Sequence, residues 1–205
     1  MNENVAIWQR ALHKLDIYHG EIDGVFGSGT RRGSFEAINR PDETPAKVKD
    51  GQALLVMGNQ KATRNRPIMD SLRDDLIAAV TAVYGDDSRI VVYSGGQALK
   101  GSGGPRTGSV RHDDTGKGGR AADCYIYVKG SKISGIELAK LGQYWLAKKY
   151  GGVGLEMATG GIHLDNWVTP PPGGGMFWTY GYSDGKPWGS AVRAMLVKGA
   201  QGRLP

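Results

Sequence analysis

Residues 121–128 read Ala-Ala-Asp-Cys-Tyr-Ile-Tyr-Val, and residues 161–165 read Gly-Ile-His-Leu-Asp. Both stretches are apolar and β-prone, which predicts two strands. Side chains alternate between the two faces of a strand, so Asp123 and His163 point away from their apolar neighbours. On neighbouring strands this carboxylate and this imidazole could converge on one ion. The alternative is two unrelated polar residues, one on each strand.

The flanking sequence carries further motifs, which are Val-Val-Tyr-Ser-Gly-Gly-Gln at 91–97, Gly-Ser-Val-Arg-His-Asp at 108–113 and Gly-Gly-Arg-Ala-Ala-Asp at 118–123. With Gly-Ile-His-Leu-Asp they resemble the zinc D-Ala-D-Ala peptidase superfamily over residues 68–167, about half of the chain. Its members include vancomycin-resistance carboxypeptidases and the L-Ala-D-Glu endopeptidases of phage endolysins. The resemblance implies that His112, Asp123 and His163 bind Zn²⁺. This ligand set leaves a fourth position for a water whose pKa the metal lowers.

The chain departs from the family pattern at two places. Residues 113–122 make a longer connection between the first two ligands than the family usually has, and the polar sequence of residues 113–118 predicts a lengthened loop. Many members carry a Glu or Asp three residues before the last His, where this chain has Gly160. The general base must therefore come from elsewhere or be absent.

A hairpin through Ala158-Thr159-Gly160 offers a replacement for the missing base. A two-residue turn at 159–160 predicts Glu156 directly across from His163, with Cβ atoms about 4.5–5.5 Å apart. Its carboxylate would then lie beside the metal site, where a general base is needed. Asp165, two residues beyond His163 on the same face, is the rival base, or alternatively orients an imidazole.

The sequence allows two roles for Arg111 and for a group of aromatic residues, which are contact with a substrate and a structural role. Arg111 could bind a substrate carboxylate through two hydrogen bonds or polarise the scissile carbonyl. The alternative is a structural ion pair with Asp113 or Asp114. The aromatic residues either wall a substrate groove or pack in the core; they are Trp167, Trp178, Tyr180, Tyr182 and Trp188.

The N-terminal segment resembles a second family. Apolar residues from Val5 to Leu15 recur at spacings of three and four residues and predict a helix with one apolar face. Asp-Gly-Val-Phe-Gly-Ser-Gly-Thr at 23–30 predicts a loop of tight turns before a second helix. These motifs resemble the small three-helix peptidoglycan-binding domain of many wall hydrolases.

Helical patterns also occupy residues 68–83 and 134–150, where Ser134 and Glu137 have the spacing of a capping box. Helices that alternate with strands predict an α+β fold. The expected organisation is a small helical bundle at 1–50, a linker at 51–66 and a zinc peptidase domain with a mainly antiparallel sheet at 67–205.

The net charge of +6 and the pI of about 9.4 indicate an anionic partner. No DNA-binding motif or RNA platform is apparent in the sequence, so the expected partner is bacterial peptidoglycan and not nucleic acid. No apolar run is long enough to span a bilayer, and residues 1–10 lack a signal-peptide pattern. We therefore expect a monomer without stable membrane insertion, made in the host cytoplasm and acting on the wall after release.

The resemblances together imply a zinc metallopeptidase, namely a phage-type endolysin that hydrolyses a peptide bond in the peptidoglycan stem or cross-link. The same chemistry suits a D,D-carboxypeptidase that trims terminal D-Ala. A chain that keeps the fold and the metal but has lost the base would be a non-catalytic wall-binding protein, and Gly160 keeps this alternative open.

Overall fold

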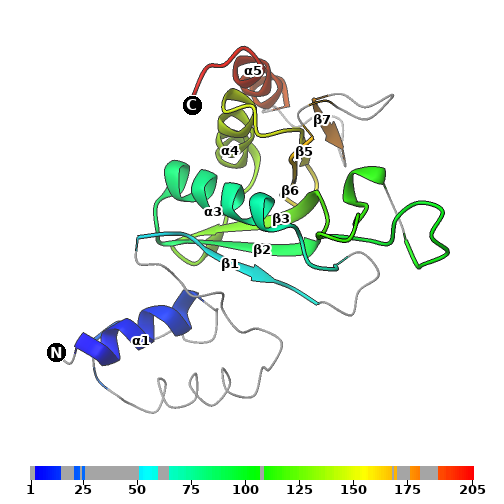
Figure 1. Ribbon diagram of the computed structural model, residues 1–205. Helices are drawn as coiled ribbons and strands as arrows, with labels where there is room; N and C mark the ends of the chain where they lie inside the picture. The colour runs from blue at the N-terminus through cyan, green and yellow to red at the C-terminus, as the bar shows by residue number, and fades with distance from the viewer. Residues whose placement is uncertain are drawn as a thin grey trace.

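The computed structural model describes residues 3–14, 21–23, 25, 51–59, 65–106, 109–167, 169, 176–180 and 189–205 (Figure 1). Its elements are, in chain order, α1 (Glu3–Lys14), β1 (Leu54–Met57), α3 (Asp70–Tyr84), β2 (Ser88–Ser94), the 3₁₀ turn η1 (Val110–His112), β3 (Ala121–Val128), β4 (Ser131–Lys132), α4 (Gly135–Ala147), β5 (Val153–Glu156), β6 (Gly161–Asp165), β7 (Phe177–Tyr180) and α5 (Gly189–Ala200). The predicted α+β class is confirmed for this part of the chain.

The seven strands form one sheet with the order β1-β2-β3-β6-β5-β7, and β4 pairs with β3 beside this path. The central pairs β2–β3, β3–β6 and β5–β6 are antiparallel, as predicted. The outer strands β1 and β7 run parallel to their neighbours. The sheet is therefore mixed.

Strand β1 corrects the predicted linker at 51–66. Residues 54–57 pair with residues 89–92 of β2, and the side chains of Leu54 and Leu55 are buried. An apolar run of this kind gains more from joining the sheet than from lying in a solvated connection. These four residues belong to the sheet that carries the candidate site.

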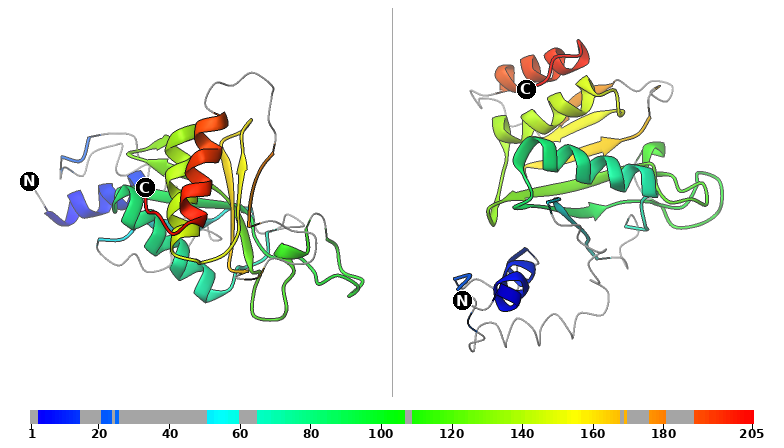
Figure 2. Two further views of the ribbon diagram at one scale, coloured as in Figure 1. Left: turned by 90° about the horizontal axis from the view of Figure 1, so that it is seen from above. Right: turned by 60° about the vertical axis from the view of Figure 1, so that its left-hand side comes forward.

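Helices α3 and α4 cover one face of the sheet, and α5 packs against α4 (Figures 1 and 2). Their buried residues recur at helical spacing and meet the strands in one core; they include Leu72, Leu76 and Val80 on α3, and Leu138, Leu141 and Trp145 on α4. The predicted capping box is not formed. Ser134 holds the N-cap position without a side-chain hydrogen bond, and Glu137 instead binds Lys140.

The two faces of the strands differ as the alternation predicted. Ile126 of β3 and both Ile162 and Leu164 of β6 are fully buried under the helices. Asp123 and His163 lie on the other face, directly opposite one another in the β3–β6 register. The sheet thus has the hydrophobic core on one face and the candidate metal ligands on the other.

The N-terminal segment is described only in part. Helix α1 agrees with the predicted first helix, and Gln9 donates from its side chain to Asp23 Oδ1 at 2.7 Å and to the carbonyl of Val25 at 3.0 Å. The rest of the predicted loop and the second helix fall on residues that the structure does not describe. Within the described ranges, no helix combines the length and the apolar character needed to cross a bilayer.

Candidate metal centre

Three different elements deliver the expected ligands. Asp123 comes from β3 and His163 from its direct cross-strand partner position on β6. His112 ends η1, a turn that Ser109 stabilises by accepting a hydrogen bond from the backbone N–H of Arg111 at 3.2 Å. The three residues are only 2–7 % exposed. The lengthened loop at 113–118 therefore does not keep the ligands apart.

The ligand atoms form a small triangle. His112 Nε2 lies 3.2 Å from His163 Nδ1 and 3.4 Å from Asp123 Oδ1, and His163 Nδ1 lies 2.8 Å from Asp123 Oδ1. Two ligands of a tetrahedral zinc ion, each at roughly 2.0–2.1 Å from the metal, are about 3.4 Å apart. The triangle therefore has the size of one face of such a tetrahedron.

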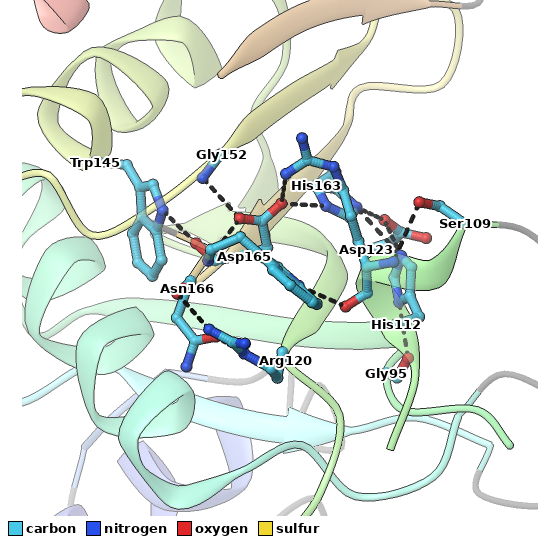
Figure 3. Close-up of polar contacts among 12 residues, drawn as sticks. Gly95, Ser109, His112, Arg120, Asp123, Trp145, Gly152, His163, Asp165 and Asn166 are labelled. Atoms are coloured by element: carbon cyan, nitrogen blue, oxygen red, sulfur yellow. Dashed lines mark hydrogen bonds and ion pairs between the residues drawn. The ribbon is translucent and has the colours of Figure 1, made fainter. Parts of the chain in front are cut away.

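The hydrogen-bond partner of the outer nitrogen of each imidazole determines which ring nitrogen carries the hydrogen (Figure 3). His112 Nδ1 lies 2.8 Å from the carbonyl oxygen of Gly95, so it must carry a hydrogen and donate. His163 Nε2 lies 3.1 Å from Asp165 Oδ2 and likewise donates. In the neutral rings both inner nitrogens are then acceptors, and they face each other and the acceptor oxygen of Asp123. Three mutually facing acceptors require a cation or a proton between them.

The charge of the nearby carboxylates favours both a metal ion and a proton between the three acceptor atoms. Burial opposes ionisation of Asp123, but hydrogen bonds with His112 and His163 outweigh it and hold the pKa of the carboxyl well below its usual range. Burial also opposes protonation of His163, but hydrogen bonds with Asp123 and Asp165 raise its pKa above the ordinary value. A proton and a metal ion therefore compete for Nδ1 of His163.

Asp165 connects the imidazole to the rest of the fold. It is fully buried and forms an ion pair with Arg111, which is only 4 % exposed. Its other oxygen accepts from the backbone N–H of Gly152 at 2.7 Å and of Trp167 at 3.0 Å. The sequence left Arg111 open between contact with the substrate and an ion pair with Asp113 or Asp114; the structure pairs it with Asp165, 54 positions along the chain.

The predicted hairpin register is wrong by two residues. Glu156 pairs with Gly161, and Gly154 is the residue directly across from His163. The physical reason is the loop: residues 157–160 form a four-residue turn, which Gly160 closes by donating to the carbonyl of Glu156 at 3.0 Å. A register shift of two residues leaves each side chain on the same face of the sheet. Glu156 therefore still points to the side that carries His163.

Glu156 lies in the wall of a pocket over the three ligand atoms. The pocket has a volume of about 310 Å³, and its other walls include Tyr93, Trp178 and Tyr180. The ring of Trp178 lies over Gly154, where a Cβ atom would come within 2.5 Å of the indole. Of the aromatic residues left open by the sequence, Trp178 and Tyr180 line the pocket, while Tyr182 and Trp188 fall outside the described residues.

Tyr93 was missed as a site residue. It is the middle residue of the Val-Val-Tyr-Ser-Gly motif, which was the signal that could have identified it, and on β2 it directly precedes Ser94, the register partner of Asp123. Burial, with Asp123 and other acidic groups nearby, raises the pKa of its hydroxyl, which therefore stays protonated and can donate.

Within the described residues, His112, Asp123 and His163 are thus a buried group that could hold a metal ion. Comparisons with protein-family models, with curated proteins and with solved structures find no match to this chain.

Proposed function

We propose that this chain is a zinc-dependent peptidoglycan hydrolase that cleaves a peptide bond of the stem peptide or cross-link. One observation carries the proposal: three buried acceptor atoms face one another, while Gly95 and Asp165 orient both imidazoles from behind. Two imidazoles and one carboxylate are the donor set of catalytic zinc, which keeps an open position, rather than of structural zinc. The resemblance of the surrounding motifs to wall peptidases supports the substrate class.

The roles of the chain's own residues follow from their positions. A bound zinc ion lowers the pKa of water and polarises a carbonyl oxygen. Glu156, in the same pocket, takes a proton from the attacking water and gives it to the departing amine. Asp165 holds the hydrogen on His163 Nε2, which keeps Nδ1 available as a ligand. Arg111 positions Asp165 through their buried ion pair and is not assigned to the substrate.

The proposal is tested by digesting purified muropeptides with the zinc-loaded chain and identifying the cleaved bond by mass spectrometry. Glu156→Gln keeps the size of the side chain but cannot accept the proton, so turnover should fall by about 10²–10⁴-fold with zinc retained. Glu137→Gln is the matched control, because it removes an exposed carboxylate on α4 that pairs with Lys140. Its turnover should equal that of the unchanged chain.

Other outcomes assign other functions. Release of terminal D-Ala alone would identify a D,D-carboxypeptidase, and wall binding without cleavage would identify a non-catalytic protein. Full turnover in Glu156→Gln would remove this carboxylate from the chemistry. If Asp165→Asn were then inactive with zinc still bound, Asp165 would be the base.

A further inference from the structure

The sheet face that carries the metal centre continues past it as a surface of tyrosines and cations. We define the tyrosine strip as Arg89 and Tyr93 of β2, Tyr125 and Tyr127 of β3, and Lys132 of β4. The first four side chains are half-buried and Lys132 is exposed. Their neighbours along the strands, such as Ile90 and Ile126, are fully buried on the helical side.

Contacts hold the strip together. The rings of Tyr93 and Tyr125 stack with their centroids 4.4 Å apart, and Lys132 Nζ lies 4.6 Å from the centroid of Tyr125. The guanidinium of Arg89 lies 4.5 Å from the centroid of Tyr127, its direct cross-strand partner. Cation–aromatic contacts of this kind restrict the two long side chains and keep their charges at the surface.

The strip joins two hollows. Tyr93 is part of the wall of the metal pocket. At the other end, Arg89 and Tyr127 line a cavity of about 190 Å³ whose far wall is Arg10 and His13 of α1. The exposed Lys129 adds a further cation to this cavity, which also contains Asp87. A linear ligand that leaves the metal pocket along β3 therefore reaches the N-terminal helix.

We infer that the strip binds the stem peptide next to the bond that is cut, as an extended anionic chain whose carboxylates meet Arg89 and Lys132. This inference rests on the proposed function. Four residue steps separate Asp123 from Tyr127, or roughly 14 Å at about 3.4 Å per step, which matches about four residues of an extended peptide. Stem peptides carry free carboxylates, and the strip offers two cations beside flat amphipathic rings that suit a peptide backbone.

The test compares two ligands that differ only in charge: a muropeptide with free carboxylates, and the same muropeptide with these groups amidated. Binding of both is measured by calorimetry to the metal-free chain, in which the proposed hydrolysis is off, and cleavage is measured on the zinc-loaded chain. The variants are Arg89→Gln, Lys132→Gln and both together. Lys148→Gln is the matched control, because Lys148 lies 5.6 Å from the ring centroid of Tyr144 on the helical side.

Each strip variant should weaken binding of the acidic peptide by about 1.5- to 5-fold, the range for ion pairs at a protein surface, and the double variant should multiply the two losses. Binding of the amidated peptide should not change in any variant. Lys148→Gln should bind both peptides as tightly as the unchanged chain does. Cross-strand stabilisation alone predicts equal losses for both peptides, and this result would overturn the inference. The amidated peptide is also an internal reference for any variant that folds less well.

Different results would contradict the strip inference and the proposed function. If the unchanged chain cleaves no muropeptide but shows charge-dependent binding through Arg89 and Lys132, the strip is supported and the hydrolase proposal is not. If the unchanged chain cleaves muropeptides while the strip variants bind and cleave both peptides normally, the strip inference alone is wrong.

Discussion

Replacing Asp165 by Asn should separate the metal-binding role of this carboxylate from its role in folding. The amide can still accept from the backbone N–H groups of Gly152 and Trp167, so its NH₂ group must face Arg111 and His163. There it meets a buried guanidinium, with which it cannot pair, and it can satisfy His163 only by donating to Nε2. The imidazole hydrogen then moves to Nδ1, the atom that faces Asp123 and the proposed metal position.

Two magnitudes follow from this geometry. Removing one partner of a buried ion pair costs about 3–5 kcal/mol in the free energy of unfolding, and Arg111 and Asp165 are both buried. Loss of a hydrogen-bond partner behind a metal-bound imidazole costs about 10- to 100-fold in metal affinity. The double variant Arg111→Met with Asp165→Asn removes the unpaired charge, so it should recover part of the stability but none of the zinc affinity.

Urea unfolding measures the stability of each variant, and competition with a chromophoric chelator measures the zinc affinity. Asp70→Asn is the control, because it breaks an exposed ion pair with Arg73 on α3 and should change stability by less than about 1 kcal/mol. Zinc affinity in Asp165→Asn within twofold of the unchanged chain would refute the tautomer argument. Recovery of zinc affinity together with stability in the double variant would show that the loss came from folding alone.

Three further predictions address the metal, the hairpin and the N-terminal segment. Protonated His163 stabilises the metal-free fold below the ordinary pKa of 6.5, and this contribution is lost as pH rises through its raised folded pKa, whereas metal binding needs the neutral ring. The gain in Tm on adding zinc should therefore grow from pH 6 to pH 8, and a constant gain would contradict the assignment of Nδ1 as ligand. Gly160→Glu should lower stability by at least about 1–2 kcal/mol in thermal unfolding, because Gly160 has a φ of +74°. A Cβ there would also lie 2.9 Å from Ser134 Cβ, so the new carboxylate should not rescue turnover in Glu156→Gln, and rescue would show that it reaches the site. A chain beginning at residue 51 should keep cleavage of soluble muropeptides but lose rate on whole sacculi, because a wall-binding tether raises local substrate concentration, and equal rates on sacculi would assign residues 1–50 a structural role. A chain beginning at residue 67 lacks β1 and should unfold at lower temperature than the longer one.

Alternation within strands was the most predictable part of the fold. A period of two in residues 121–128 and 161–165 was sufficient to place Asp123 and His163 on the face opposite Ile126 and Leu164. The helical pattern over 68–83 likewise anticipated α3, because its apolar residues recur every three or four positions. These features are local, so a short window of sequence contains the information that determines them.

Features that depend on distant residues were not predictable. The ion pair between Arg111 and Asp165 joins η1 to β6, and nothing in the spacing favours it over the acidic neighbours at 113 and 114. The register of β5 against β6 depends on whether the turn uses two residues or four, and Thr-Gly is compatible with both. The apolar run at 54–57 was visible, but its partner β2 lies beyond the whole of α3.

The central strands have one face under the helices and one face with the candidate ligands, and this limits which changes of sequence the fold can tolerate. Residues such as Tyr125, Tyr127 and Glu156 can be exchanged without touching a core side chain, because their neighbours in sequence, not they, contact the helices. A single inserted or deleted residue in β6 has the opposite effect, since it would turn His163 into the apolar layer and Ile162 out of it. We therefore expect the fold to tolerate substitutions at these partly exposed positions and to be intolerant of any change in strand length.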